Sequence, residues 1–271
     1  MKFFLTGFSG LIGSSFRRLL NAEHQQVVLL GREKPSLNKY ESFLYYNLES
    51  PFVSPVTSKD EVIILHCAYN FSSRDSYFNS RSTLNLLKAF ELTQCKKFVF
   101  FSTPIDHQDT SDLSSYQSDK VQSESFFELD RDLILCPSFI FSNDSKSSKL
   151  FNAIKNFHIP IPIPKNSNLI FPIKVNALAH EVYFKLILEN VSGKFLIIGS
   201  ASQSFATFLK INFRISSFEM PYIVFTIATS LFKVLSFQYL ALRIEGLLRL
   251  PNLQKIQSTD SVIIIDESEN I

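Results

Sequence analysis

Three of the seven glycines in this chain, Gly7, Gly10 and Gly13, fall within seven residues near the N-terminus. They separate a short apolar run, Lys2–Thr6, from a segment with apolar residues at helical spacing. Glycine costs backbone entropy, so such a cluster marks a tight turn or a close approach to the backbone. A strand, a glycine-rich turn and a helix are typical of a dinucleotide-binding loop. We predict as cofactor-binding residues Gly7, Phe8, Ser9, Gly10, Leu11, Ile12 and Gly13.

The first two-thirds of the chain alternates apolar runs with helical patterns. Strands are expected at residues 2–6, 26–30, 43–46, 61–66, 97–102 and 133–136, and helices at 10–20, 78–93 and 115–129. Continuous apolar strands are buried on both faces, and intervening helices imply parallel pairing through right-handed crossovers. We therefore predict an α/β fold with a doubly wound parallel sheet of the Rossmann type.

The pattern changes after about residue 142. The stretch HIPIPIPKN is proline-rich and must be extended, and a helix at 176–189 and a strand at 194–198 follow. We divide the chain into a dinucleotide-binding domain at 1–142, a smaller and mainly substrate-binding lobe at 143–265 with elements returning to the Rossmann sheet, and a frayed tail at 266–271.

Composition narrows the cellular setting. A net charge of +2 without a block of lysine and arginine argues against nucleic acid as a partner. The three cysteines lie far apart with no CxxC pair, which indicates reduced thiols and no metal cluster. The apolar start is too short for a signal peptide, so we expect a cytoplasmic protein. Residues 220–242 carry a single charge and are just long enough to span a bilayer, but a packed or surface-associated helix is the favoured interpretation.

The end of the second expected strand bears on the choice of dinucleotide. Gly31 leaves room there, and Arg32 can pair with a 2′-phosphate in a bidentate manner. We therefore favour NADP, with NAD possible. The alternative is that Arg32 is a solvated loop charge and that Glu33 takes the acidic role.

Tyr116 and Lys120 are four residues apart and share one face of an expected helix. A free tyrosine has a pKa near ~10, and a nearby ammonium lowers it, which makes the phenol a usable general acid or base. Thr103 follows the strand KKFVFFS, where a hydroxyl could orient a substrate oxygen. The spacing of Tyr116 and Lys120 alone is a weak signal.

Taken in order, the motifs resemble those of the extended short-chain dehydrogenase/reductases, whose NAD-dependent epimerase/dehydratase group acts on nucleotide sugars. The matching stretches are TGFSGLIGSSF, DEVIILHCAYN, YFNSRSTLNLLKAF, FVFFST, YQSDKVQSE, LILCPSFIFS and FPIKVNALAHEV. The resemblance implies catalytic roles for Thr103, Tyr116 and Lys120, with the last two also holding the cofactor. Further cofactor contacts implied by it are Asn47, Leu48, Cys67, Ala68 and Pro137.

The resemblance further implies an NAD(P)-dependent epimerase or reductase of a nucleotide sugar, serving cell-surface polysaccharide synthesis, and a homodimer through the helices around Leu84 and Val121. The chain departs from the family pattern at Asn47, Asp119, Cys136, Ser142 and Asn176. These departures leave open the exact reaction. A non-catalytic dinucleotide-binding protein with a structural or sensing role, possibly membrane-associated, is the alternative.

Overall fold

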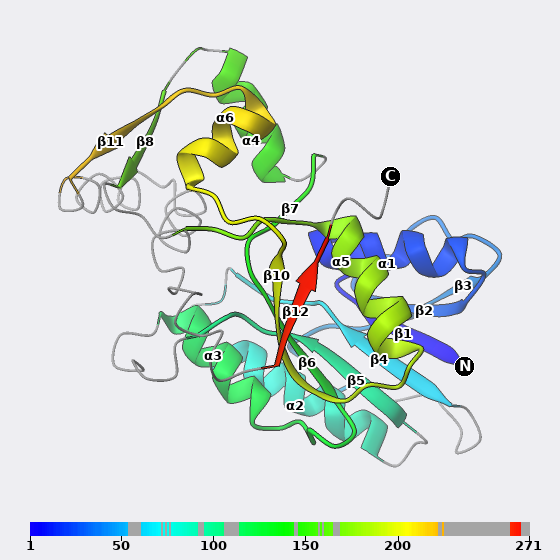
Figure 1. The fold of residues 1–271 in the computed structure, drawn as a ribbon. Helices are drawn as coiled ribbons and strands as arrows, with labels where there is room; N and C mark the ends of the chain where they lie inside the picture. Colours follow the sequence, from blue (N-terminus) through cyan, green and yellow to red (C-terminus); the bar gives the residue numbers. More distant parts are fainter. Residues whose placement is uncertain are drawn as a thin grey trace.

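The computed structural model describes residues 1–53, 61–71, 73, 75, 77–91, 95–105, 114–143, 146–156, 158, 160–164, 169–221, 224 and 261–266. A parallel sheet lies at the centre, with strand order β12-β10-β6-β5-β4-β1-β2-β3 (Figure 1). The strands are β1 Lys2–Thr6, β2 Gln26–Gly31, β3 Glu41–Tyr45, β4 Val62–His66, β5 Cys95–Phe101, β6 Leu133–Pro137, β10 Gly193–Gly199 and β12 Ser261–Ile265. The predicted doubly wound sheet is confirmed.

The strand order reverses beside β1. The chain first adds β2 and β3 on one side of it, and then crosses to place β4, β5 and β6 on the other. In sheets of this kind, ligands bind outside the carboxyl ends of the strands at this switch point. The glycine-rich loop leaves the carboxyl end of β1 and therefore lies at that point.

Helices cover both faces of the sheet. Helix α1, Leu11–Ala22, packs against α5, Val175–Glu181, whereas α2, Phe78–Glu91, packs against α3, Ser115–Glu124 (Figure 1). Successive side chains of a strand point to opposite faces, so β1 contributes to two cores. Phe3 and Leu5 are fully buried in the core under α1 and α5, and Phe4 in the one under α2. Two aromatic-rich layers thus hold the strand that carries the loop.

A small lobe lies apart from the sheet (Figure 1). It contains α4, Lys146–Asn156, α6, Phe205–Phe213, and the parallel pair β8, Ile161–Pro164, and β11, Ser217–Met220. Its core includes Phe208, Leu209 and Phe213. A second parallel pair, β7 at Ile140–Phe141 and β9 at Ile173–Lys174, leads into it. The expected extended backbone of the proline-rich stretch is confirmed in β8.

One helix ends earlier than predicted, and another contains a π-helical turn that was not predicted. The helix expected to reach residue 129 ends at Glu124, because the following backbone turns toward Asp132, whose buried carboxylate accepts the amides of Glu128 and Phe98 at 3.0 Å. The helix expected at 176–189 is α5 followed by a π-helical turn, Val182–Ile187.

Two further expectations fall largely or wholly on residues outside the described ranges. These are the apolar stretch 220–242, of which only 220, 221 and 224 are described, and the tail after Asp266. No helix among the described residues has the length and apolar character needed to cross a membrane.

Candidate active site

The glycine-rich loop is packed tightly against the loop that follows β4. Gly7 has φ +65°, and a Cβ added to it would lie 2.6 Å from the carbonyl carbon of Cys67. A Cβ on Gly13 would lie 2.2 Å from the carbonyl oxygen of Gly7, so this position admits no side chain either. Both glycines are therefore required by the way the loop folds onto residues 67–68 and onto the start of α1.

Gly10 has a different environment. An added Cβ there would meet only the carbonyl oxygen of Gly7, at 3.2 Å, and both Gly10 and Ser9 are exposed. Gly10 is the N-cap of α1 and provides no side-chain cap, and the first turn has no acidic residue. The free amides and positive dipole end of this helix suit an anionic group such as a pyrophosphate.

A buried hydrogen-bond chain fixes the loop after β4. The Thr6 hydroxyl accepts the amides of residues 67 and 68, both at 3.1 Å, so its proton is directed to Nδ1 of His66, 2.8 Å away. His66 therefore carries its proton on Nε2 and donates it to Thr83 at 3.1 Å, and Thr83 donates to the carbonyl of Asn79 at 2.9 Å. This network was not predicted from the sequence, although His66 lies in one of the motifs quoted above.

The same network extends to the next residues of the loop. The side chain of Asn79 accepts the amide of Asn70 at 2.6 Å and donates to its carbonyl at 3.2 Å. Burial, with a contribution from Lys120, lowers the pKa of His66 to about 3, so the imidazole is neutral at physiological pH. The loop that borders the glycine turn is thus held by groups that do not titrate near neutrality.

Tyr116 and Lys120 lie on α3, which begins with a capping box between Ser114 and Gln117. Tyr116 is half-buried, whereas Lys120 is buried and its Nζ donates to the carbonyl of Phe101 at 2.6 Å. That Nζ lies 6.0 Å from the centre of the Tyr116 ring. Burial lowers the pKa of Lys120 to about 8. The ammonium is therefore held at the end of β5, two residues before the half-buried Thr103.

Two aromatic residues that the sequence analysis did not single out flank Tyr116. The ring of Tyr69 lies edge-on at 5.0 Å, and that of Phe71 is stacked at 5.8 Å. The Tyr69 hydroxyl donates to Asp119 at 3.0 Å. Burial and this carboxylate raise the pKa of Tyr69 well above that of a free phenol, so Tyr69 acts as a donor and not as a base. Its position directly after Ala68 was the available signal.

The end of β2 differs from the sequence-based expectation. Gly31 was expected to leave room for a ligand, but the ring of Phe8 fills that space, since a Cβ on Gly31 would lie 2.6 Å from Cε1 of Phe8. Arg32 is exposed and has no hydrogen bond or ion pair with the described residues. The side chain of Asn47 accepts the amide of Glu49 at 3.3 Å, and the carbonyl of Leu48 accepts the Ser82 hydroxyl.

The residue before Pro137 marks a departure that the structure explains in part. Cys136 is buried, with its Sγ 4.0 Å from Oε1 of Glu124. The cation that faces Glu124 comes instead from the neighbouring strand, where Nζ of Lys194 lies 2.8 Å from Oε2. Pro137 itself is the buried last residue of β6, at the same edge of the sheet as the other predicted contacts.

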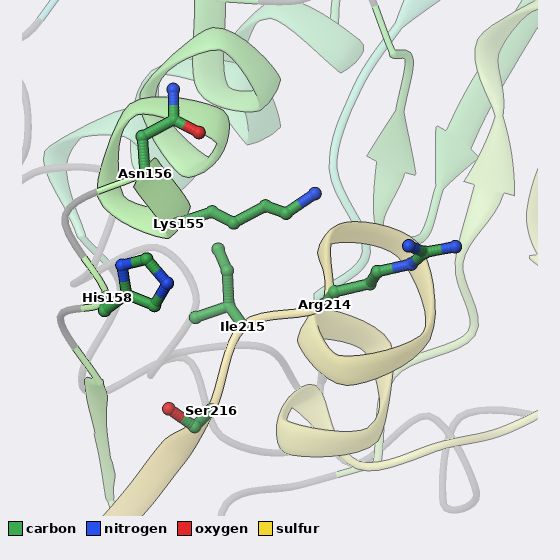
Figure 2. Close-up of a pocket in the computed structure, with 6 residues that line it drawn as sticks. All are labelled: Lys155, Asn156, His158, Arg214, Ile215 and Ser216. Carbon is green, nitrogen blue, oxygen red and sulfur yellow. The ribbon is translucent and has the colours of Figure 1, made fainter.

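A cavity of about 590 Å³ lies in the small lobe and holds none of the predicted site residues (Figure 2). Its lining residues are Lys155, Asn156, His158, Arg214, Ile215 and Ser216. Lys155 is in the last turn of α4, and Arg214 is the C-cap of α6. Cations at these positions offset the negative ends of the helix dipoles. Within the described ranges, no three His, Cys, Asp or Glu side chains could together hold a metal ion.

Residues 3–126 match the NAD dependent epimerase/dehydratase family. The epimerase/dehydratase span runs from β1 through α3, so it includes the glycine loop, Thr103, Tyr116 and Lys120. The resemblance inferred from the sequence motifs is confirmed there. No curated protein matches the chain by sequence.

Solved structures share the fold of this chain. The Bordetella bronchiseptica enzyme WbmH in complex with NAD+ is 14% identical, with a TM-score of 0.63 over 81% of this chain and 85% of that one. The UDP-N-acetylglucosamine 4-epimerase of Bacillus cereus is 16% identical, with a TM-score of 0.62 over 82% and 85%. A hypothetical dTDP-4-dehydrorhamnose reductase from Sulfolobus tokodaii is 17% identical, with a TM-score of 0.61 over 81% and 86%.

Proposed function

We propose that this chain is an NAD(P)-dependent enzyme that epimerises or reduces a nucleotide sugar, with Tyr116 as its acid/base. One observation carries the proposal. The glycine loop contacts residues 67–68, and the next residue, Tyr69, contacts Tyr116. The phosphate-binding end of α1 and the phenol of α3 therefore lie on either side of one short loop, as a bound dinucleotide requires.

The residues fit a dinucleotide in extended form. The amides of the first turn of α1, after the exposed Gly10, would receive the pyrophosphate. Residues 67–68 would line the middle of the dinucleotide, and residues 47–48 would border the adenine. Tyr116, Lys120 and Pro137 would hold the nicotinamide end. The bound cofactor would supply or accept a hydride. We favour NADP because Arg32 is an exposed cation just after β2 and has no ion-pair partner in the part of the chain that the structure describes.

The chain's own groups would move the proton. Tyr116 would give a proton to, or take one from, the sugar oxygen, and the Thr103 hydroxyl would position that oxygen. While Lys120 is protonated, its charge favours the phenolate of Tyr116. Two of the structures that share the fold are named for a UDP-linked and a dTDP-linked sugar, which supports a nucleotide sugar as the substrate class. A cytoplasmic location, a role in polysaccharide synthesis and a homodimer through α2 and α3 remain predictions.

Mass spectrometry of the purified, undenatured protein tests the cofactor half of the proposal. We expect a retained or readily rebound dinucleotide. Tightly held NAD would favour an epimerase, which must regenerate its cofactor within the site, and easily lost NADPH would favour a reductase. A protein that neither retains nor rebinds either dinucleotide would contradict the proposal.

Turnover of nucleotide sugars by Tyr116→Phe tests the chemical half. The variant should bind the dinucleotide as the wild type does but lose about 10² or more in turnover. Tyr77→Phe, at a phenol that is 51% exposed, is the matched control and should retain activity. Bound dinucleotide without turnover in the wild type would favour the alternative, a non-catalytic binding protein. The held position of Lys120 on the Phe101 carbonyl is the observation consistent with that alternative.

A further inference from the structure

We infer that Phe8 determines which dinucleotide this site accepts, an inference that rests on the proposed function. In dinucleotide-binding sheets, the residue at the end of the second strand reads the adenosine ribose, and a carboxylate there binds the free 2′-hydroxyl of NAD. In this chain the position is Gly31, the last residue of β2, and the ring of Phe8 lies against it.

Gly31 is required by that ring and not by its own backbone. Among the described glycines, only Gly7 and Gly193 have positive φ, so Gly31 has a conformation open to other residues. A Cβ at Gly31 would nevertheless lie 2.6 Å from Cε1 and 3.1 Å from Cζ of Phe8. Any side chain at this position must therefore displace the ring.

The ring is not free to move away. Phe8 is only 9% exposed, and the guanidinium carbon of Arg17 lies 5.8 Å from the ring centre. Arg17 is itself held by Glu41 through two hydrogen bonds, of 2.6 and 2.7 Å. The Arg17–Glu41 ion pair therefore holds the Phe8 ring in place against Gly31.

Because the Phe8 ring requires glycine at position 31, the end of β2 has no carboxylate to bind the adenosine ribose. The Phe8 ring occupies the space that an acidic side chain at position 31 would need in order to bind the 2′-hydroxyl. The nearest carboxylate along the chain is that of Glu33, which is exposed two residues further on. The nearest charged side chain along the chain is Arg32, which suits a 2′-phosphate. Phe8 therefore removes the preference for NAD, and Arg32 supplies the preference for NADP.

A stability cycle tests the packing without any cofactor. Gly31→Ala should lower the Tm of the full chain by about 4 °C or more, because the added methyl group overpacks the site. Phe8→Leu removes the ring atoms that meet this methyl group. In that background, Gly31→Ala should have a much smaller effect. Equal losses of Tm in both backgrounds would overturn the inference, because the ring would then not be what requires glycine.

Calorimetric titration with NAD and with NADP tests specificity. We expect F8A/G31D to shift the ratio of the two dissociation constants toward NAD by about tenfold or more, since a charged hydrogen bond is gained. F8A/G31N, with an uncharged side chain of the same shape, should shift it much less. Wild-type binding with an unchanged ratio in F8A/G31D would overturn this inference alone. Absence of binding by the wild type would overturn the proposed function as well. If F8A/G31D does not fold, the stability cycle still tests whether the Phe8 ring is what requires glycine at position 31, and equal losses of Tm there would overturn the inference.

Discussion

The hydroxyl of Tyr69 donates a 3.0 Å hydrogen bond to Oδ2 of Asp119, a residue that is only 2% exposed. The other carboxylate oxygen accepts the amide of Ser80, at 2.9 Å, near the start of α2. One buried carboxylate thus ties the loop after β4 to both α2 and α3. Position 119 is one of those at which the chain departs from the family pattern, and here its carboxylate is paired with the Tyr69 hydroxyl.

Asp119→Ser should therefore destabilise the protein. The substitution leaves the Tyr69 hydroxyl and the Ser80 amide without their acceptor, which should lower the free energy of unfolding by about 2–4 kcal/mol. Tyr69→Phe in the same chain should add much less than its effect alone, because the two groups interact directly. Urea unfolding of the two single variants and the double variant measures this coupling. Asp130→Asn, at an exposed carboxylate, is the control, and additive losses would contradict the pairing.

His66 should make stability depend on pH. Its folded-state pKa of about 3 lies below the ordinary value of 6.5, so protonation favours the unfolded chain. The stability that the neutral imidazole contributes is complete above pH 6.5 and is lost toward pH 3, at about 1.4 kcal/mol per pH unit. Urea unfolding between pH 7 and pH 4 should show a shallower dependence in His66→Gln, which does not titrate. His24→Asn, at an exposed imidazole, should leave the slope unchanged.

The buried ammonium of Lys120 should lower the free energy of unfolding, although the residue is needed for turnover. Its pKa is lowered from 10.5 to about 8, so below pH 8 the folded protein holds a buried charge that the unfolded chain hydrates. Lys120→Met should raise the free energy of unfolding at pH 7 by about 1–2 kcal/mol, a net value that allows for the lost hydrogen bond to the Phe101 carbonyl. The same substitution should abolish turnover. The gain should shrink as pH rises through 8 toward 10.5, because the lysine becomes neutral. Lys88→Met, at an exposed lysine, is the control. If Lys120→Met is less stable than the wild type while this control is not, the buried ammonium does not reduce stability and the prediction is wrong.

Arg32→Ala should weaken NADP binding by about tenfold or more and leave NAD binding nearly unchanged, since only the 2′-phosphate would need the guanidinium. Lys34→Ala, at an exposed lysine two residues away, is the matched control for a general loss of positive charge. Titration of each variant with both dinucleotides measures the effect. Equal losses for NAD and NADP would mean that Arg32 does not distinguish them.

Much of the fold was predictable because its strands are continuous apolar runs. Each of the runs in the first two-thirds of the chain became a parallel strand. Most of these strands are buried on both faces, whereas β3 at the edge of the sheet is partly exposed. The two-residue strands β7 and β9 were not predictable, because they pair at a separation that no local pattern records. The π-helical turn after α5 likewise has a sequence that reads as an ordinary helix.

The site was predictable to the extent that motif and topology agree. The strand–glycine–helix order placed the loop at the end of β1, and the spacing of Tyr116 and Lys120 placed both on α3. The contacts between side chains of distant segments that pack between these elements could not be predicted. The ring of Phe8 at Gly31 and the bond between Tyr69 and Asp119 each depend on contacts that form only after the sheet has assembled.

The pairing of β12 with β10 also bears on where the chain can be truncated or tagged. Strand β12, at residues 261–265, hydrogen-bonds along β10 and covers one edge of the sheet, although it comes near the end of the sequence. A truncation before Ser261 would leave the N–H and C=O groups of a mostly apolar strand open to pairing with another molecule. Shortened versions of this protein should therefore self-associate, whereas a purification tag is better fused before Met1 than inserted near this strand.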